Sequence, residues 1–275
     1  MVRMEPLPPL LYKFRPLTNE SDWARVSEIL LKKQLWFSSV DRFNDPFEGL
    51  VALDIRKTDQ KTAREWSTRV GAHIATGNRE ARRTKIQEVV RRVKHGMRVN
   101  GLLPGVNEIG ICCLMETVDS LLAWSHYTNG HRGLAIGFRP RPELPGNLFS
   151  FSHRVLYAEN KPIDDIVHGP RAKAFDSALL TKAKCWDYEK EWRLISDPMV
   201  PDSMRVGARA NSAATFTAEA VLEVRIGAKL SDIDRRRLVL LLKESGMSPQ
   251  LFSASLHPTK YEIVFHKLQT RELVA

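Results

Sequence analysis

Short apolar runs alternate with polar breaks along the chain, and the runs have the composition of β-strands. Their residues are aliphatic, aromatic or β-branched, and turn-forming residues bound most of them. The expected strands are residues 10–15, 35–39, 110–115, 133–138, 153–158, 191–194, 221–227 and 261–268.

Apolar residues at helical spacing predict a first helix that ends near Lys33. Trp23, Val26 and Ile29 form its apolar stripe, and either Asn19 or Ser21 can cap it. Four later helices are expected. The first covers residues 57–99, with an apolar stripe of Ile86, Val90, Val93 and Met97, and the second covers residues 120–127 with Asp119 as its cap. The third covers about fifteen residues before Lys184, and the fourth contains Leu238, Leu241 and Leu242.

Polar and proline-rich breaks separate these elements. Residues 42–49 (RFNDPFEG) form a turn, in which Asn44 and Asp45 are expected to bond the backbone. Residues 198–214 are small and polar, which is typical of a mobile loop. Because strands and helices interleave irregularly, we expect a single α+β domain over residues 1–275, with short mixed or antiparallel sheets and peripheral helices. The segment 56–100 is expected to be a basic helical insertion in that domain.

Composition excludes several classes of protein. The chain has 275 residues, of which 43% are hydrophobic and 27% charged, as in ordinary globular proteins. Residues 1–13 contain only a short apolar stretch broken by proline, so neither a signal peptide nor a membrane span is expected. Cys112, Cys113 and Cys185 fit neither a disulfide framework nor a zinc site. A cytoplasmic location without membrane attachment is therefore expected.

The positive charge is concentrated in one region. Thirteen basic and four acidic residues lie between Arg56 and Arg98, so this segment carries +9 of the total net charge of +10. Such a segment can bind DNA or RNA by releasing phosphate counterions, although a charge run on a helix is more often a solvated face. The candidate nucleic-acid contacts are Arg79, Arg82, Arg83, Arg91, Arg92 and Arg98.

Common catalytic motifs are absent from the sequence. It contains no GxxxxGK[ST] loop, no GxGxxG after a strand and no HExxH, which argues against a nucleotide triphosphatase of the P-loop type, a dinucleotide-binding dehydrogenase and a zinc protease. His126 and His131 flank a turn but lack a thiolate or carboxylate partner at ligand spacing. No metal is expected, and structural or substrate-contacting roles are favoured for both.

The most specific cluster lies at residues 188–193 (YEKEWR). If residues 191–194 form a strand, Glu191 and Arg193 point to one face and Trp192 to the other. A carboxylate beside an arginine stays ionised at neutral pH, and can therefore stabilise a cation or orient a ribose hydroxyl. A simple ion pair is the equally weighted alternative.

Two weaker clusters accompany it. Tyr12 and Arg15 lie in the first strand, where an arginine fork could bind phosphate or carboxylate, or form an edge-strand charge pair. The second cluster surrounds Trp124. For Trp124 itself, a place in the core is favoured over contact with a ligand. Its candidate ligand contacts are Ser125, His126, Tyr127 and His131.

Four motifs together resemble the bacterial family called domain of unknown function 2971. The motifs are LYKFR, LWFSSVDRFNDPFEG, ICC with DSLLAWSHYTNGHRGLAIGF, and KCWDYEKEWRLI, in this order over residues 11–195. The resemblance is associated with defence-type and mobile gene neighbourhoods, so a phage-defence or toxin context is expected.

The order of these elements is also similar to the ADP-ribosyltransferase superfamily, by analogy only. The analogy implies NAD as substrate, with Arg15 or Tyr12 holding the dinucleotide and Ser38 or Tyr127 lining the nicotinamide side. Glu191 would be the catalytic carboxylate, and Glu189 its alternate. The chain lacks the His-Gly-Thr and Ser-Thr-Ser signatures of that superfamily.

Two other functions remain open from the sequence. The first is a nucleic-acid-binding module without catalysis, through the segment 56–98. The second is a metal-independent ribonuclease that would combine His126 or His131 with Glu191 and Arg193.

Overall fold

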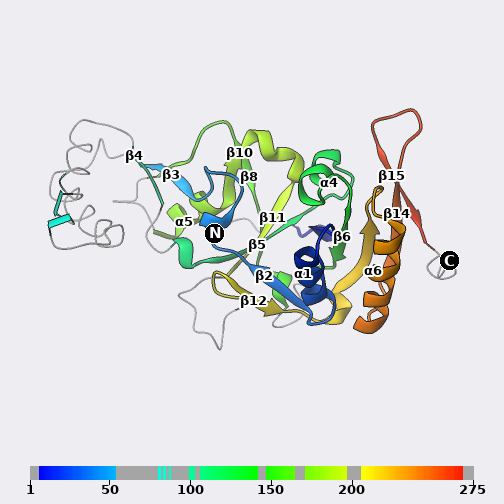
Figure 1. Ribbon diagram of the computed structural model, residues 1–275. Helices are drawn as coiled ribbons and strands as arrows, with labels where there is room; N and C mark the ends of the chain where they lie inside the picture. The colour runs from blue at the N-terminus through cyan, green and yellow to red at the C-terminus, as the bar shows by residue number, and fades with distance from the viewer. Residues whose placement is uncertain are drawn as a thin grey trace. The chain divides into compact units, whose positions relative to one another are not determined.

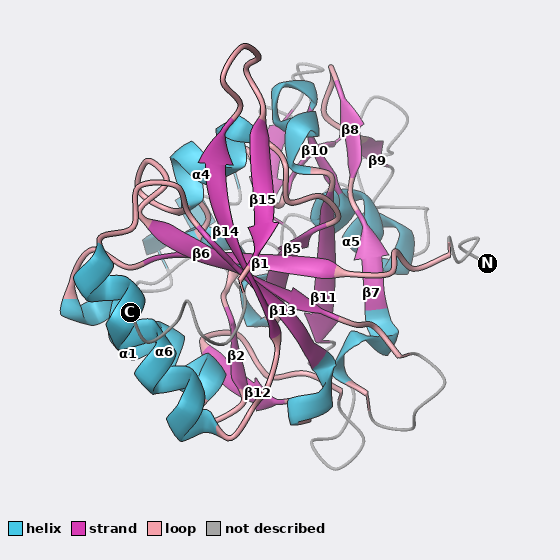
Figure 2. Ribbon diagram, turned by 90° about the vertical axis from the view of Figure 1, so that its right-hand side faces the viewer, coloured by secondary structure: helices cyan, strands magenta, loops and turns pink. Residues whose placement is uncertain are grey.

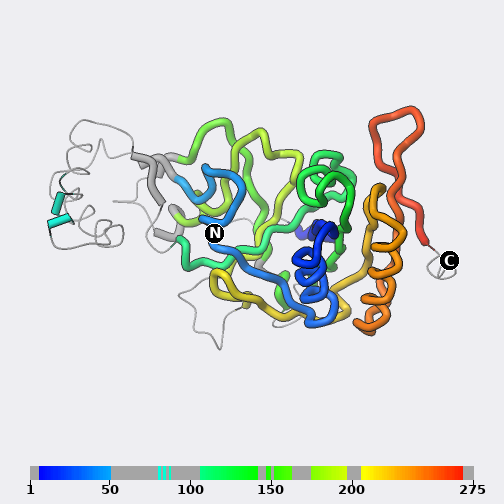
Figure 3. The backbone as a smooth tube through the Cα atoms, in the orientation of Figure 1, coloured from blue at the N-terminus to red at the C-terminus, as the bar shows by residue number. Residues whose placement is uncertain are grey.

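The computed structural model describes residues 6–53, 80–81, 83–84, 87, 99–102, 106–141, 147–164, 171–196 and 206–268. Its chain divides into two compact units. Unit 1 comprises Met1–Ser38, Gly110–Val155 and Cys185–Ala275, and unit 2 comprises Ser39–Ile109 and Leu156–Lys184. The chain therefore leaves unit 1 twice and returns to it twice, which can be followed along the tube in Figure 3.

Unit 1 is built on an eight-stranded sheet with the order β15-β14-β13-β6-β1-β5-β11-β7 (Figures 1 and 2). Its strands are β1 (Leu11–Pro16), β5 (Gly110–Met115), β6 (Gly133–Phe138), β7 (Ser152–Arg154), β11 (Glu191–Ser196), β13 (Val221–Ile226), β14 (Gln250–Leu256) and β15 (Ile263–Lys267). Only β13 and β14 run parallel; the other neighbouring strands of this sheet are antiparallel. A separate antiparallel pair joins β2 (Gln34–Phe37) to β12 (Ser212–Thr215).

Three α-helices of unit 1 begin at capping side chains. Asn19 caps α1 (Glu20–Leu30), and Ser231 caps α6 (Asp232–Ser245). The cap of α4 (Leu121–Tyr127) is Ser120, whose Oγ accepts a hydrogen bond from the amide of Ala123. The expected cap, Asp119, is wrong because the helix begins one residue later than that position requires. Short 3₁₀ helices lie at η3 (Leu148–Phe151), η4 (Lys184–Glu189) and η5 (Ala218–Ala220).

Apolar residues cover both faces of the large sheet. On one face α1 and α6 lie side by side, and Trp23, Val26 and Leu238 join Leu134 and Ile136 in the main core (Figure 2). On the other face α4 places its buried tryptophan in a second core. That core contains Tyr12, Phe14, Met115, Val118, Ala123, Trp124, Ala135, Ala254 and Ile263. The core alternative for Trp124 is thereby confirmed.

Besides the helical residues described between 80 and 87, unit 2 contains short strands and the helices named below. Its strands are β3 (Leu50–Leu53), β4 (Val99–Leu102), β8 (Leu156–Ala158), β9 (Ile163–Asp164) and β10 (Thr181–Ala183), and its helices are η1 (Val40–Arg42), η2 (Val106–Glu108) and α5 (Arg171–Leu180). β3 lies between β4 and β9, and β8 pairs with β10 in parallel.

The α+β fold class with mixed and antiparallel sheets is confirmed. The expected strands 110–115 and 133–138 coincide with β5 and β6. The single strand expected at 153–158 is wrong: it is two strands, β7 and β8, which belong to different units.

Six strands were not expected, namely β3, β4, β9, β10, β12 and β14. β12 occupies the end of the expected loop 198–214, and β4 begins at the last residue of the expected helix 57–99. Most of the expected helical insertion lies outside the described residues. No α-helix in the described part of the chain is long and apolar enough to cross a membrane.

Candidate functional site

One face of the large sheet carries a row of side chains that crosses five strands. The strand register aligns Glu191 with Met115, Met115 with Tyr12, Tyr12 with Gly137 and Gly137 with Glu223. Residues that pair across neighbouring strands point to the same face. Two glutamates therefore lie at the two ends of a row whose centre is Tyr12.

Glu191 and Arg193 form a buried ion pair within β11. Nε of Arg193 donates to Oε1 of Glu191 at 2.8 Å, and Nη2 donates to Oε2 at 3.2 Å. Their side chains are 3% and 1% exposed. Trp192 points to the other face, where its ring N–H donates to Glu116. The predicted placement of the three side chains is confirmed, and the fork-to-carboxylate geometry holds Glu191 in one orientation.

The pKa of the cysteine opposite Arg193 is affected by this ion pair. Cys113 pairs with Arg193 across β5 and β11. Burial raises the pKa of its thiol, and the nearby carboxylate of Glu191 raises it further, while Arg193 and Lys13 act in the opposite direction. A thiol with a raised pKa is protonated at neutral pH, which argues against Cys113 as a nucleophile.

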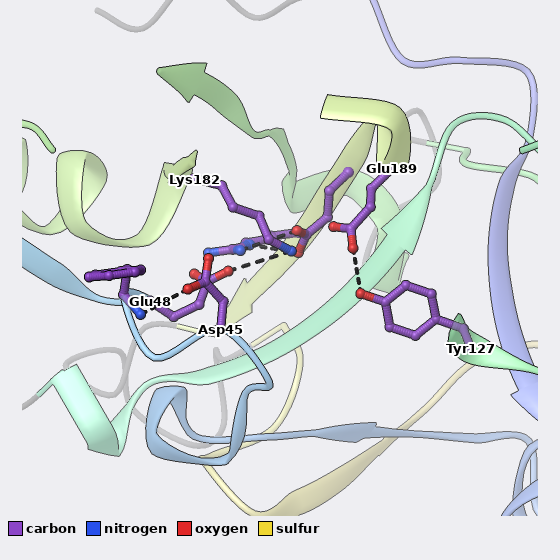
Figure 4. A network of polar contacts seen from close by, with 8 residues as sticks. Asp45, Glu48, Tyr127, Lys182 and Glu189 are labelled. Atoms are coloured by element: carbon purple, nitrogen blue, oxygen red, sulfur yellow. Dashed lines mark hydrogen bonds and ion pairs between the residues drawn. The ribbon is translucent and has the colours of Figure 1, made fainter. Parts of the chain in front are cut away.

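Glu189 is a second buried acid, two residues before Glu191. The hydroxyl of Tyr127, on α4, donates a hydrogen bond to its carboxylate (Figure 4). Lys190, between the two glutamates, is exposed and has a φ of 43°. This left-handed conformation costs a residue with a side chain about 1–2 kcal/mol. It allows both Glu189 and Glu191 to point inward at the junction of η4 and β11.

Three aromatic side chains, one of them Tyr127, lie around His126. His126 makes edge contacts with Tyr127, Trp186 and Tyr188, whose ring centroids lie 6.5, 6.4 and 5.9 Å from its own. Its Nδ1 lies 2.8 Å from the hydroxyl of Tyr188. His126 is exposed and the three other rings are half-buried. We refer to His126, Tyr127, Trp186 and Tyr188 as the aromatic cluster; it offers ring faces and edges on which a flat ligand can stack.

Tyr12, at the centre of the row, is bonded to a residue that the sequence did not single out. Its hydroxyl donates to Oε1 of Glu223 at 2.8 Å, and the same oxygen accepts from Nε of Arg225 at 2.6 Å. Burial, followed by the hydrogen bond to Glu223, raises the pKa of Tyr12. The sequence signal that could have revealed Glu223 is its spacing, since Glu223 and Arg225 repeat the Glu-x-Arg pattern of Glu191 and Arg193.

The structure separates Arg15 and Ser38 from the acids. Arg15 lies on the sheet face opposite Glu191, because side chains alternate along β1 and Tyr12 lies on the Glu191 face. Burial lowers the pKa of the Arg15 guanidinium. Ser38 is bonded through its backbone to Ile111 in both directions.

Ser125 lies in the last turn of α4, and His131 lies in the turn that follows the helix. Ser125 is exposed, and its carbonyl accepts from the amide of Gly130. The ring of His131 stacks on Trp124 with the planes 9° apart. Burial, and then the charge of Lys229, lower the pKa of His131. His131 is thus placed against the core and not among the aromatic cluster.

Most of the basic segment 56–98 lies outside the described residues. Arg83 is helical and exposed, whereas Arg79, Arg82, Arg91, Arg92 and Arg98 lie outside the described residues. Within the described ranges, no group of three or more His, Cys, Asp or Glu residues could hold a metal ion.

Comparison with protein families gives one match, and the matched segment includes the acids and the aromatic cluster. Residues 123–194 match the model of a family described as a protein of unknown function (DUF2971). The match runs from α4 into β11 and confirms the resemblance based on the sequence motifs. No curated protein and no solved structure matches the chain.

Proposed function

We propose that the protein is an NAD-consuming enzyme of the ADP-ribosyltransferase type, with its active site at the aromatic cluster. The observation that supports it is the arrangement of two buried carboxylates, Glu189 and Glu191, on either side of the strained Lys190. Strained backbone of this kind is concentrated at functional sites, because the surrounding structure must stabilise it. The acids, the strained residue and the aromatic cluster all lie in the segment that matches the family model.

Cleavage of the nicotinamide bond needs two properties that these residues combine. The leaving group is a flat ring, which the aromatic cluster can stack. Positive charge then develops on the ribose, and a carboxylate that is already fixed in place stabilises this charge. Water would first have to reorganise to do the same. Arg193 holds the carboxylate of Glu191 in one orientation through two hydrogen bonds.

The two tyrosines have different places in this proposal. Tyr127 is half-buried and bonded to Glu189, so it lines the nicotinamide side. Tyr12 is only 6% exposed and bonded to Glu223, so it supports the sheet and does not hold the dinucleotide. The position of Arg15 on the opposite face leaves the residue that binds the pyrophosphate unassigned.

Nicotinamide release from NAD by the purified protein tests the proposal, with and without RNA or DNA as acceptor. Glu191→Gln or Glu189→Gln should reduce release by about 10²–10³-fold if that residue is the catalytic carboxylate. Glu223→Gln is the matched control, because it removes a carboxylate of the same Glu-x-Arg spacing at the far end of the row. Equal rates in all four proteins, or no release by the unmodified chain, would remove the support for an NAD-consuming enzyme.

A ribonuclease is the second candidate, because the exposed His126 lies on rings that could stack a base. Shortening of RNA without NAD, lost in His126→Ala, would favour it. Binding of RNA or DNA without either reaction would favour a binding module, with the segment 56–98 as the basic surface.

The proposal implies a cytoplasmic enzyme. Cys112, Cys113 and Cys185 are all free thiols, as in proteins of reducing compartments. A defence or toxin role would follow from NAD consumption, since loss of this cofactor stops the metabolism of the host cell.

A further inference from the structure

Unit 2 contains a cavity that has no part in the proposed reaction. Its volume is about 280 Å³, near the lower end of the range for small-molecule sites. Three segments line it: the turn after η1, the loop after β8, and β10. The lining residues are Asp45, Phe47, Glu48, Leu50, Ala158, Glu159, Asn160, Lys161, Pro162, Thr181, Lys182 and Ala183.

Two of the buried charges in this lining are opposite in sign and close to each other. Nζ of Lys182 lies 3.6 Å from Oε1 of Glu48, and the side chains are 5% and 2% exposed (Figure 4). The attraction between the two charges offsets part of the cost of removing each of them from water. Glu48 and Lys182 together therefore add no net charge to the cavity.

Asp45 is the buried charge that lacks such an ion pair. It is 5% exposed, and its Oδ1 accepts from the amide of Phe47 at 2.9 Å, which confirms the expected role of Asp45 in the turn. In the described part of the chain, Asp45 makes no ion pair. A buried carboxylate without a cation is costly, so this wall of the cavity favours a positively charged ligand.

Phe47 provides the second element of a cation site. Its side chain is unusually exposed for a phenylalanine, at 54%. Nζ of Lys161 lies 4.6 Å from the centre of the ring, a geometry in which an ammonium group is attracted by the ring face. The protein thus already places one ammonium group on this ring, and a ligand ammonium would compete with it.

We propose that this cavity binds a small organic cation, a primary amine with an apolar body, through Asp45 and Phe47. The ammonium donates to the carboxylate of Asp45, and the apolar body lies against Phe47, Leu50 and Pro162. Three carboxylates and two amines line the cavity, so its formal charge disfavours an anion.

Calorimetric titration of the full chain with 2-phenylethylamine tests the site, and 3-phenylpropanoate serves as a probe of similar size and opposite charge. The amine should bind and the carboxylate should not. Asp45→Asn should weaken binding of the amine about tenfold, because it removes a charge-assisted hydrogen bond. The amide oxygen of asparagine can still accept from the amide of Phe47, so the turn is retained.

A substitution of Lys161 distinguishes a binding site from residues that only stabilise the fold, because it should increase the affinity for the amine. Lys161→Met removes the competing ammonium and should tighten binding of 2-phenylethylamine. Glu159→Gln, which removes an exposed carboxylate at the same cavity, is the control for general electrostatics and should change the affinity less than Asp45→Asn.

Three results would overturn the proposal. They are binding of 3-phenylpropanoate in preference to the amine, no binding of either probe, and equal affinity of the amine for the unmodified chain and for folded Asp45→Asn. Thermal unfolding of each variant establishes that it is folded. None of these results depends on NAD chemistry, so they are independent of the proposed reaction in unit 1.

Discussion

Two Glu-x-Arg pairs on the same sheet face differ in their surroundings. In β11, Arg193 binds Glu191 with both side chains almost completely buried; in β13, Arg225 binds Glu223 with the arginine side chain 18% exposed. Arg225 also lies 4.7 and 4.6 Å from the ring centres of Phe252 and Phe265.

The second pair therefore joins β13 to the β14–β15 hairpin, while the first lies next to the strained Lys190 and the aromatic cluster. The Glu-x-Arg spacing is thus enough to form an ion pair within a strand. The neighbouring strands determine whether that pair stabilises the sheet or lies beside a candidate site.

Removal of each arginine should separate the two pairs most strongly. Arg193→Met leaves the carboxylate of Glu191 buried without its partner, and should lower the free energy of unfolding by about 3–5 kcal/mol. Arg225→Met removes a partly exposed pair and a cation–π contact, and should cost about 1–2 kcal/mol. Urea unfolding measures both, and equal losses would contradict the distinction based on burial.

A substitution at Gly137, in β6 between the strands of Tyr12 and Glu223, tests how tightly the second pair is packed. A Cβ at Gly137 would lie 2.8 Å from Cγ of Glu223 and 3.1 Å from Cε1 of Tyr12. Gly137→Ala should therefore cost about 1–3 kcal/mol of stability through overpacking.

The matched double variant identifies the clash. Combination with Glu223→Ala removes Cγ. The double variant should therefore lose less stability than the sum of the losses in the two single variants. Strict additivity would mean that the alanine is accommodated in another way.

The smallest effect is expected from the hydroxyl of Tyr12. Tyr12→Phe removes its hydrogen bond to Glu223 and should cost about 1 kcal/mol at neutral pH. Because the pKa of Tyr12 is raised in the folded protein, the stabilisation is complete below the unfolded pKa of about 10 and is lost as the pH rises from there towards the folded pKa. The stability difference between the unmodified chain and Tyr12→Phe should therefore shrink above about pH 10 in urea unfolding. A difference that does not change with pH would contradict the cause given for the shift.

The central strands were predictable because they combine apolar composition with clear boundaries. β5 and β6 each begin at a glycine and are buried along most of their length. Two of the missed strands lack this signal: β12 (SAAT) is small and polar, and β10 (TKA) has three residues. Such strands form because a partner is available in the folded chain, which local composition does not reveal.

For the candidate site, the sequence predicted relations within one strand and missed relations between strands. Glu191 and Arg193 were assigned to one face because side chains alternate. Glu223 was missed because its bond to Tyr12 joins residues 211 positions apart. Arg15 was grouped with Glu191 although they belong to opposite faces, since only the pairing through β5 relates the two strands.

The position of β1 inside the large sheet has a consequence for synthesis. β1 is the first strand of the chain, but its neighbours are β5 and β6, which begin at Gly110 and Gly133. At a translation rate of roughly 5–20 residues per second, β1 waits on the order of 5–20 s for its first partner. During that interval its apolar residues and backbone amides have no strand to pair with, so the nascent chain offers them to chaperones or to neighbouring chains before the sheet can close around them.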